Sequence, residues 1–459
     1  MVERIVGDNM QPVKIIDTSF NYLAEVDDYE SLIWRRRWHK TGDFEMHINL
    51  NKRNAEHLKK GNIVLLEANK TGIIRHHEIT IDEGGKGSEK LVIKGSSLAC
   101  VLGRRITIPP EGYAYDKMTA NAETIMKGYV DRNCINPVDT KRIIPLLGLA
   151  IDQARGDKTT YQTRLKQLDE ELEKLSLVSG LGWDVYLDIE NKKWIFDVFE
   201  GKDLTVGQTE NPPVIFSVDF DNIEAQQYIE SELGYKTTAY VGGQGEGVNR
   251  TIIETGKDTT GLGRYETFVD ARDIENELEL PERGKQKLAE LQEIKVFDSE
   301  IMTESSFRYE EDWNLGDIVT VQNKKWGITL DTRITEVIEI YERNGFRLGV
   351  AFGSNIPTLV EKIKQEIDIP TIEKISKISE LENDVGYITD GEIPQAATYV
   401  HNQIIPLEEW IIAHNLGRYP NTTIIDSAGT VVIGEIRYID ENNIQVSFTS
   451  GFSGKAYLN

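Results

Sequence analysis

Short apolar runs separated by glycines fill the first hundred residues, and this pattern constrains the fold more than any other feature. The runs cover residues 31–34, 44–48, 63–66, 73–74 and 91–93. Glycines at positions 42, 61, 72, 84 and 85 separate them. Runs of this length with glycine punctuation are typical of antiparallel strands in a barrel or sandwich. We therefore predict that residues 1–108 form a first β-barrel.

The segment 109–215 changes character after its paired prolines and predicts an α+β domain. Helices are expected near 121–131 and over 161–179, because Leu165, Leu168 and Leu172 recur at the three- and four-residue spacing of one helix face. Two strands, 183–189 and 194–199, follow and should form a hairpin.

Residues 216–355 return to strand-like runs and predict a second β-barrel that carries one helix. Strands are expected at 215–220, 237–241, 251–254, 317–322, 328–340 and 346–352, and the helix at 281–292. The stretch 314–319 (NLGDIV) echoes 59–64 (KKGNIV), since in both a β-branched pair follows a glycine turn. This echo is too short to establish a repeat, but it is compatible with two similar β-barrels in one chain.

The last hundred residues predict a connector and a terminal domain. Residues 356–392 combine acids, prolines and isoleucines spaced mostly three to five apart. This fits either an acidic linker or a short trimeric coil, because isoleucine-rich seams favour three strands. Residues 393–459 predict an all-β domain. The expected fold class is mainly β with an α+β insertion: two β-barrels, an α+β domain, a linker or coil and a small C-terminal β-domain.

Charge and composition exclude several classes of protein. The net charge of −24 over 459 residues argues against specific nucleic-acid binding, which depends on cations that displace phosphate counterions. An acidic surface suits either solubility or passage of DNA without sticking. No long apolar run occurs, so we expect neither a membrane span nor a secretory signal. Cys100 and Cys134 are expected to be buried free thiols rather than a disulfide or a nucleophile.

No motif specific for catalysis, a cofactor or a metal ion stands out. His76 and His77 are adjacent, so on a strand they would point to opposite faces. The glycine run 242–247 lacks the spacing of a dinucleotide fingerprint and the helix that should follow it. Ser453 lies in a β segment instead of the strand-to-helix turn of a nucleophile elbow. We therefore expect no catalytic residues, no cofactor and no metal site, and predict that the protein is not an enzyme.

Several segments of the first 355 residues resemble baseplate hub and tail-associated proteins of phages that infect Gram-positive bacteria. The resemblance is carried by 28–34 (DYESLIW), 42–45 (GDFE), 72–74 (GII), 92–98 (VIKGSSL), 102–106 (LGRRI) and 240–247 (YVGGQGEG), with Arg250. It implies a homotrimer in which each chain contributes two hub-type β-barrels to a ring that matches the hexameric tail tube. The implied partners are the distal tail protein, the tail tube and the tape-measure protein.

The C-terminal part is similar to terminal modules of tail fibre and tail-tip proteins. The segments that carry this similarity are 378–387 (ISELENDVGY), 410–420 (WIIAHNLGRYP) and 453–459 (SGKAYLN). Many relatives carry a peptidase or glycan hydrolase after the hub, whereas only the linker and the terminal β-domain follow residue 355 in this sequence. Enzymatic digestion of the cell wall is therefore not expected.

The leading functional hypothesis is a structural baseplate hub at the tail tip of a virion or tailocin, assembled in the bacterial cytoplasm. Such a hub would close the tail tube as a trimer and present the small β-domain toward the host. The alternative is a receptor-binding or cell-wall carbohydrate-binding tail protein, and a peptidoglycan hydrolase is a further alternative. For glycan binding, the side chains of Trp410, Tyr419, Tyr438 and Phe452 could stack on sugar rings, while core packing is the other role open to each.

Overall fold

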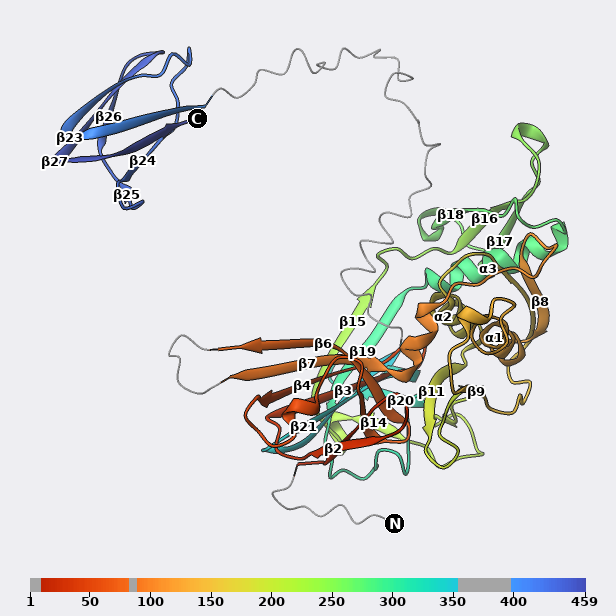
Figure 1. Ribbon diagram of the computed structural model, residues 1–459. Coiled ribbons are helices and arrows are strands. Elements are labelled where there is room, and N and C mark those ends of the chain that lie inside the picture. Colours follow the sequence, from red (N-terminus) through yellow and green to blue (C-terminus); the bar gives the residue numbers. More distant parts are fainter. Residues whose placement is uncertain (1–9, 82–88, 354–397) are drawn as a thin grey trace. The chain divides into compact units, whose positions relative to one another are not determined.

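The computed structural model describes residues 10–81, 89–353 and 398–459 (Figure 1). The chain divides into two compact units, Met1–Ile367 and Asp368–Asn459, and each unit is described by itself. The predicted linker or coil at 356–392 lies outside the described residues. In the described part, no helix is long and apolar enough to cross a membrane.

The first strand group of the first unit comes from residues 13–97. Its strands are β1 (Val13–Ile16), β2 (Tyr22–Val26), β3 (Ser31–Arg37), β4 (Asp43–Asn49), β5 (Ile63–Glu67), β6 (Lys70–Thr80) and β7 (Lys90–Ser97). Alternation decides which side chains face inward, so in β4 Phe44, Met46 and Ile48 are buried. Trp34 stacks on Phe44 with ring centroids 4.9 Å apart. Gly95 has no side chain because a Cβ there would lie 2.4 Å from the Phe44 ring.

The second strand group comes from residues 203–353. Its strands are β13 (Asp203–Leu204), β14 (Ile215–Ser217), β15 (Ile223–Ser231), β19 (Ile294–Ile301), β20 (Ile318–Asn323), β21 (Ile328–Glu342) and β22 (Gly345–Gly353). Aromatic side chains fill its core: the Phe216 ring centroid lies 5.3 Å from that of Trp313 and 5.0 Å from that of Phe352.

The two strand groups repeat one connectivity. Five strands of each lie side by side in the order first, second, fifth, fourth, third: β3-β4-β7-β6-β5 and β15-β19-β22-β21-β20. Tyr228 packs on Phe297, with centroids 4.9 Å apart, at the place that Trp34 and Phe44 occupy in the first group. The third strands, β5 and β20, follow turn glycines with φ of +95° and +92°. The sequence echo between 59–64 and 314–319 therefore marks a structural repeat.

The prediction of two β-barrels was wrong on one point. β3 pairs antiparallel with β21, from Ser31 opposite Glu342 to Arg37 opposite Glu336. One 14-stranded sheet thus runs through both strand groups, and the described strands form no closed barrel. β21 is long enough for its first half to pair with β20 and its second half with β3. Local alternation predicts that a strand exists but does not reveal which distant strand borders it.

The α+β segment between the strand groups contains both expected helices and both expected strands, but one helix starts later than predicted and three further strands were not predicted. It contains β8 (Asp116–Asn121), α1 (Ala122–Val130), β9 (Leu147–Leu149), β10 (Lys158–Thr163), α2 (Leu168–Ser179), β11 (Gly182–Asp188) and β12 (Lys193–Phe199). The helix expected over 161–179 begins only at Leu168. Residues 158–163 pair with β8 instead, because three β-branched threonines there favour a strand. The expected β11–β12 hairpin is confirmed.

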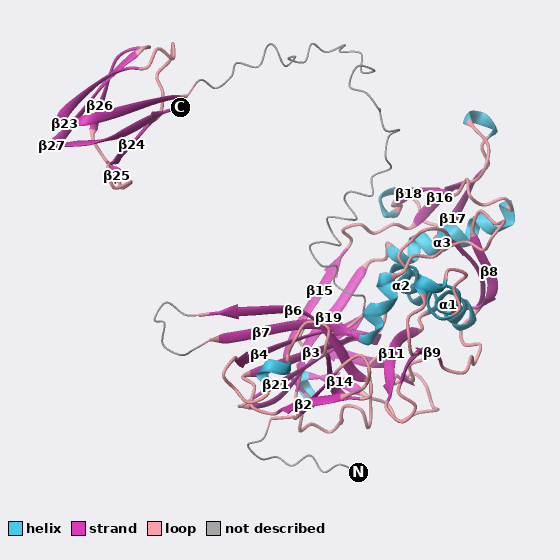
Figure 2. Ribbon diagram, in the orientation of Figure 1, coloured by secondary structure: helices cyan, strands magenta, loops and turns pink. Residues whose placement is uncertain are grey.

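A small α/β insert interrupts the second strand group between β15 and β19. It holds β16 (Thr238–Gly242), β17 (Ile252–Gly256), β18 (Glu266–Asp270) and α3 (Leu280–Glu290), close to the expected helix. α3 packs on β16 and β17 and also contacts α2. Figure 2 shows the three α-helices gathered together, away from the β6–β7 hairpin.

The second unit is all-β, as expected for the C-terminal domain. Its sheet contains β23 (Tyr399–Ala413), β24 (Thr422–Asp426), β25 (Val431–Val432), β26 (Glu435–Asp440) and β27 (Asn443–Leu458). β27 is the central strand and pairs with β23, β24 and β26. Trp410, Ile412, Ile444 and Val446 form part of a core that belongs to this unit alone.

Candidate functional site

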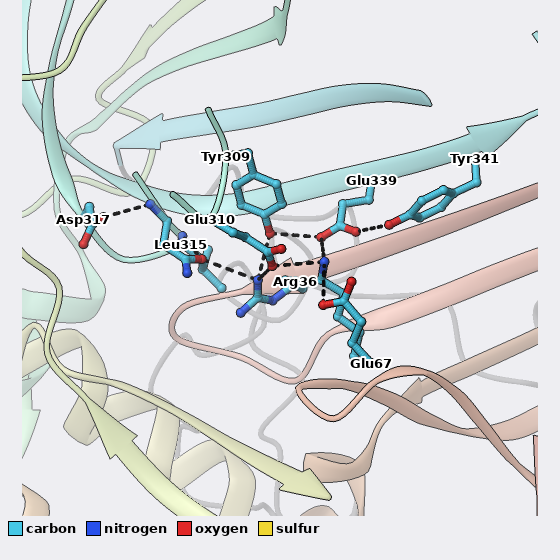
Figure 3. Close-up of polar contacts among 10 residues, drawn as sticks. Arg36, Glu67, Tyr309, Glu310, Leu315, Asp317, Glu339 and Tyr341 are labelled. Atoms are coloured by element: carbon cyan, nitrogen blue, oxygen red, sulfur yellow. Dashed lines mark hydrogen bonds and ion pairs between the residues drawn. The ribbon is translucent and has the colours of Figure 1, made fainter. Parts of the chain in front are cut away.

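The most distinctive polar site lies where the two strand groups meet (Figure 3). We name it the junction cluster and centre it on two fully buried charges, Lys70 and Glu339. Its members are Arg36, Glu67, Lys70, Tyr309, Glu310, Glu339 and Tyr341. They come from β3, β5, β6, β21 and the loop before β20, so the cluster ties five chain segments together.

Lys70 supplies the buried positive charge of the junction cluster. Its Nζ lies 3.0 Å from Glu310 Oε1, 3.1 Å from Glu339 Oε1 and 3.4 Å from Glu67 Oε2. The ammonium also lies over the Tyr309 ring, 5.5 Å from its centroid. A buried ammonium is tolerated only when carboxylates compensate its lost hydration, and three carboxylates do so here.

Glu339 supplies the buried negative charge and accepts two phenolic hydrogen bonds. The Tyr309 hydroxyl donates to Oε1 at 2.9 Å, and the Tyr341 hydroxyl donates to Oε2 at 2.5 Å. Burial raises the pKa of both tyrosine hydroxyls, and the adjacent Glu339 carboxylate raises it further. The two phenols therefore stay protonated and act as donors.

Arg36 connects the cluster to the loop that precedes β20. Its Nη1 donates to the Tyr309 hydroxyl at 2.8 Å and to Glu310 Oε1 at 3.3 Å. Asp317 holds the same loop in shape, because its carboxylate accepts the backbone N–H of Asn314 and of Lys202, both at 2.8 Å. Arg36 thus fixes the middle of the loop, and Asp317 fixes its end.

The geometry of the junction cluster is suited to holding the two strand groups together rather than to catalysis. Each carboxylate of the cluster is engaged by a cation or a phenol, and the cluster contains no cysteine, serine or histidine. In the described ranges, no group of three His, Cys, Asp or Glu side chains is arranged to hold a metal ion.

A second junction joins β3 to the α+β segment through Trp38. The indole Nε1 of Trp38 donates to the Gly180 carbonyl at 2.9 Å, and that of Trp183 donates to the His39 carbonyl at 3.0 Å. The Trp38 ring lies so close to Gly316 that a Cβ there would come within 2.1 Å. His39 is buried with its Nδ1 2.6 Å from Ser176 Oγ, and burial lowers the pKa of its imidazole to about 3.

The structure separates the four residues predicted to contact glycans. Trp410 is fully buried, and Phe452 is half-buried against the Trp410 ring. Tyr419 and Tyr438 are exposed and pack edge to face, with centroids 5.5 Å apart. The Tyr438 hydroxyl donates to the Pro420 carbonyl at 2.8 Å. The glycan-contacting role of the four residues stays a prediction. Among them, Tyr419 and Tyr438 are the two whose rings a sugar could reach from solvent.

The residues that the sequence analysis excluded from catalysis or ligand binding have structural roles. In the glycine run 242–247, the Arg250 side chain donates to the carbonyls of Gly242 at 2.9 Å and Gly243 at 3.0 Å, so the loop binds its own arginine. The expectation for Cys100 and Cys134 is confirmed, since both are free and buried. Burial raises the pKa of both thiols, that of Cys134 to about 12.

The sequence analysis missed the junction cluster, although one signal was present. Glu339 stands two residues from the buried Val337 in a strand, so alternation places its carboxylate on the core side. Lys70 gives no such signal, because a lysine after a hairpin turn is ordinarily exposed. Its burial depends on partners more than two hundred residues away.

Comparison with known proteins identifies a matching protein family. Residues 12–354 match the family model described as Siphovirus ReqiPepy6 Gp37-like protein. No curated protein matches the chain. The match spans well over half of the chain and confirms the expected resemblance to phage tail proteins. The class is therefore a phage tail structural protein. Within that class, the chain belongs to the Siphovirus ReqiPepy6 Gp37-like protein family.

Solved structures with a similar chain trace include three prophage or tail proteins. The 43 kDa tail protein of prophage MuSo2 from Shewanella oneidensis is 12% identical, with a TM-score of 0.49, over 74% of this chain and 98% of that one. The tail protein from Neisseria meningitidis MC58 is 14% identical, with a TM-score of 0.46, over 75% and 96%. The prophage tail protein gp18 from Listeria monocytogenes EGD-e is 12% identical, with a TM-score of 0.47, over 77% and 98%.

Proposed function

We propose that this phage tail protein is a baseplate hub, which closes the tail tube as a homotrimer at the tip of a virion or tailocin. The observation that carries the proposal is family membership across residues 12–354. The internal repeat supports it, because three chains with two like strand groups each supply six similar units to a ring. Such a ring fits a hexameric tube. The distal tail protein, tail tube and tape-measure protein are the partners that this role requires.

The junction cluster supports a load-bearing role for each chain. The ion pairs from Lys70 to Glu310 and Glu339 join the two strand groups and resist their separation, because parting the groups breaks both pairs. One sheet shared by both groups has the same effect. A plug that must hold the tube shut until it meets a host needs such internal stiffness.

The test is the mass of the purified full chain, measured by sedimentation or light scattering, together with electron-microscopy class averages. We expect a species of three times the 52.1 kDa chain mass and a ring seen end on. A stable monomer across the micromolar range contradicts the proposal.

A second role, glycan binding by the C-terminal unit, is favoured by one observation. The exposed rings of Tyr419 and Tyr438 stand nearly at right angles, 87° apart, and so offer an aromatic face beside an edge. We expect the full chain to bind host cell-wall polymers and Tyr419→Ala to weaken that binding. Tyr113→Ala, which removes an exposed tyrosine from the first unit, is the control. Equal binding by both variants contradicts this role.

A further inference from the structure

The outer half of β6 has a free edge. β5 pairs with β6 only from Lys70 to Ile73, and among the described strands no other pairs on that side. Residues 75–81 beyond this point are exposed, including Ile79 at 47% and Ile81 at 64%. Figure 1 shows the β6–β7 hairpin extending from the rest of the sheet. A free edge with exposed aliphatic side chains is a ready site for another strand.

β15 is another open border of the same sheet. Among the described strands it pairs only with β19, and its Glu224, Gln227 and Glu230 are exposed. The border at β2 differs, because the Asn54 side chain covers it by donating to the Glu25 carbonyl at 2.7 Å.

The internal repeat relates these two free edges to a contact that the chain already makes. β6 holds in the first strand group the place that β21 holds in the second, and β15 corresponds to β3. Both fourth strands carry one extra residue at the same point, Arg75 in β6 and Thr335 in β21. After Thr335, β21 pairs with β22 on one side and with β3 on the other. After Arg75, β6 pairs with β7 on one side, and no described strand pairs with its other side.

We propose that residues 76–81 of one copy pair antiparallel with β15 of a neighbouring copy, repeating the β21–β3 contact between chains. Matching Arg75 to Thr335 and Tyr228 to Trp34 fixes the register. It places His76 opposite Ser231 and Ile81 opposite Gln226. The contact is head to tail, so it can continue around a ring and close it.

The side chains brought together by this register are complementary. Ile79 lies opposite Tyr228, an aliphatic and aromatic pair of the kind that stabilises neighbouring strands. His77 lies opposite Glu230, and the β15 border also carries Glu224 while the β6 edge carries Arg75. The pairing covers the two exposed isoleucines. At the equivalent place inside the chain, Glu339 is fully buried by β3.

This inference rests on the proposed trimer, and a cysteine cross-link tests it in the full chain. Thr80→Cys with Gln227→Cys puts two thiols directly opposite, at a Cα separation of about 5 Å that a disulfide can span. On mild oxidation, we expect covalent dimers and trimers. The native cysteines do not interfere, because both are buried.

The matched control is Thr80→Cys with Ser231→Cys, which displaces one thiol by four residues, about 13 Å along the strand. It should yield several-fold less cross-linked product. If the matched pair gives no more product than this control while the protein remains a trimer, strand pairing is refuted and the hub proposal stands. If the wild-type protein is a monomer, both fail.

Discussion

At the scale of single residues, Lys70 is the charge of the junction cluster whose removal should cost the most folding stability. Lys70→Met leaves Glu339 buried without its ammonium, and breaking a buried pair in this way costs about 3–5 kcal/mol. We expect urea denaturation to show that loss in the first unit. The double variant Lys70→Met with Glu339→Gln should recover part of it, because the stranded charge is gone.

An exposed ion pair provides the control for Lys70. Lys52 pairs with Asp28 at the surface, so Lys52→Met should cost less than about 1 kcal/mol. Equal losses for Lys52→Met and Lys70→Met would mean that the buried pair adds nothing beyond an exposed one.

His39 makes stability depend on pH in a predictable direction. Its folded pKa of about 3 lies below the ordinary 6.5, so the unfolded chain binds the proton more tightly. Stability is therefore full above pH 6.5 and falls as the pH drops toward 3. Between pH 7 and pH 5 the expected loss from this group is about 2 kcal/mol. His39→Gln should remove that part of the slope in the free energy of unfolding, measured at both pH values.

The partly exposed His57, which lies outside the proposed contact between chains, is the comparison for His39. His57→Gln should keep the wild-type decline between pH 7 and pH 5. An unchanged decline in His39→Gln would show that other groups, and not this imidazole, set the dependence.

At the scale of elements, local pattern predicted many strands and the presence of all three α-helices, but it missed several strands, including β15 and β19, and placed the start of α2 too early. It failed where distant pairing decides. Residues 158–163 form a strand because β8 lies beside them, although Tyr161 fits the apolar spacing of the helix that follows. The β3–β21 pairing could not be predicted from local pattern either. Buried and exposed side chains alternate along each strand in the same way whether the strands close into a barrel or continue as one sheet. The junction cluster follows from that pairing, so its residues could not be assembled from sequence alone. The C-terminal unit was easier to predict because all its strands pair within 62 described residues.

At the scale of the whole molecule, the two units have separate hydrophobic cores and should unfold separately. Trp34 lies in a core of the first unit and Trp410 in the core of the second, and both are almost fully buried. Replacing a buried tryptophan by alanine costs about 3–5 kcal/mol, which is comparable with the entire stability of a unit as small as the second. We therefore expect calorimetry to resolve two transitions, with Trp410→Ala abolishing or lowering one and Trp34→Ala lowering the other. The first unit should melt as one transition despite its two strand groups, because a shared sheet and a buried ion-pair cluster join them. A third transition in the calorimetric trace would contradict this coupling of the strand groups. A tryptophan variant that shifts both transitions equally would contradict the independence of the two units.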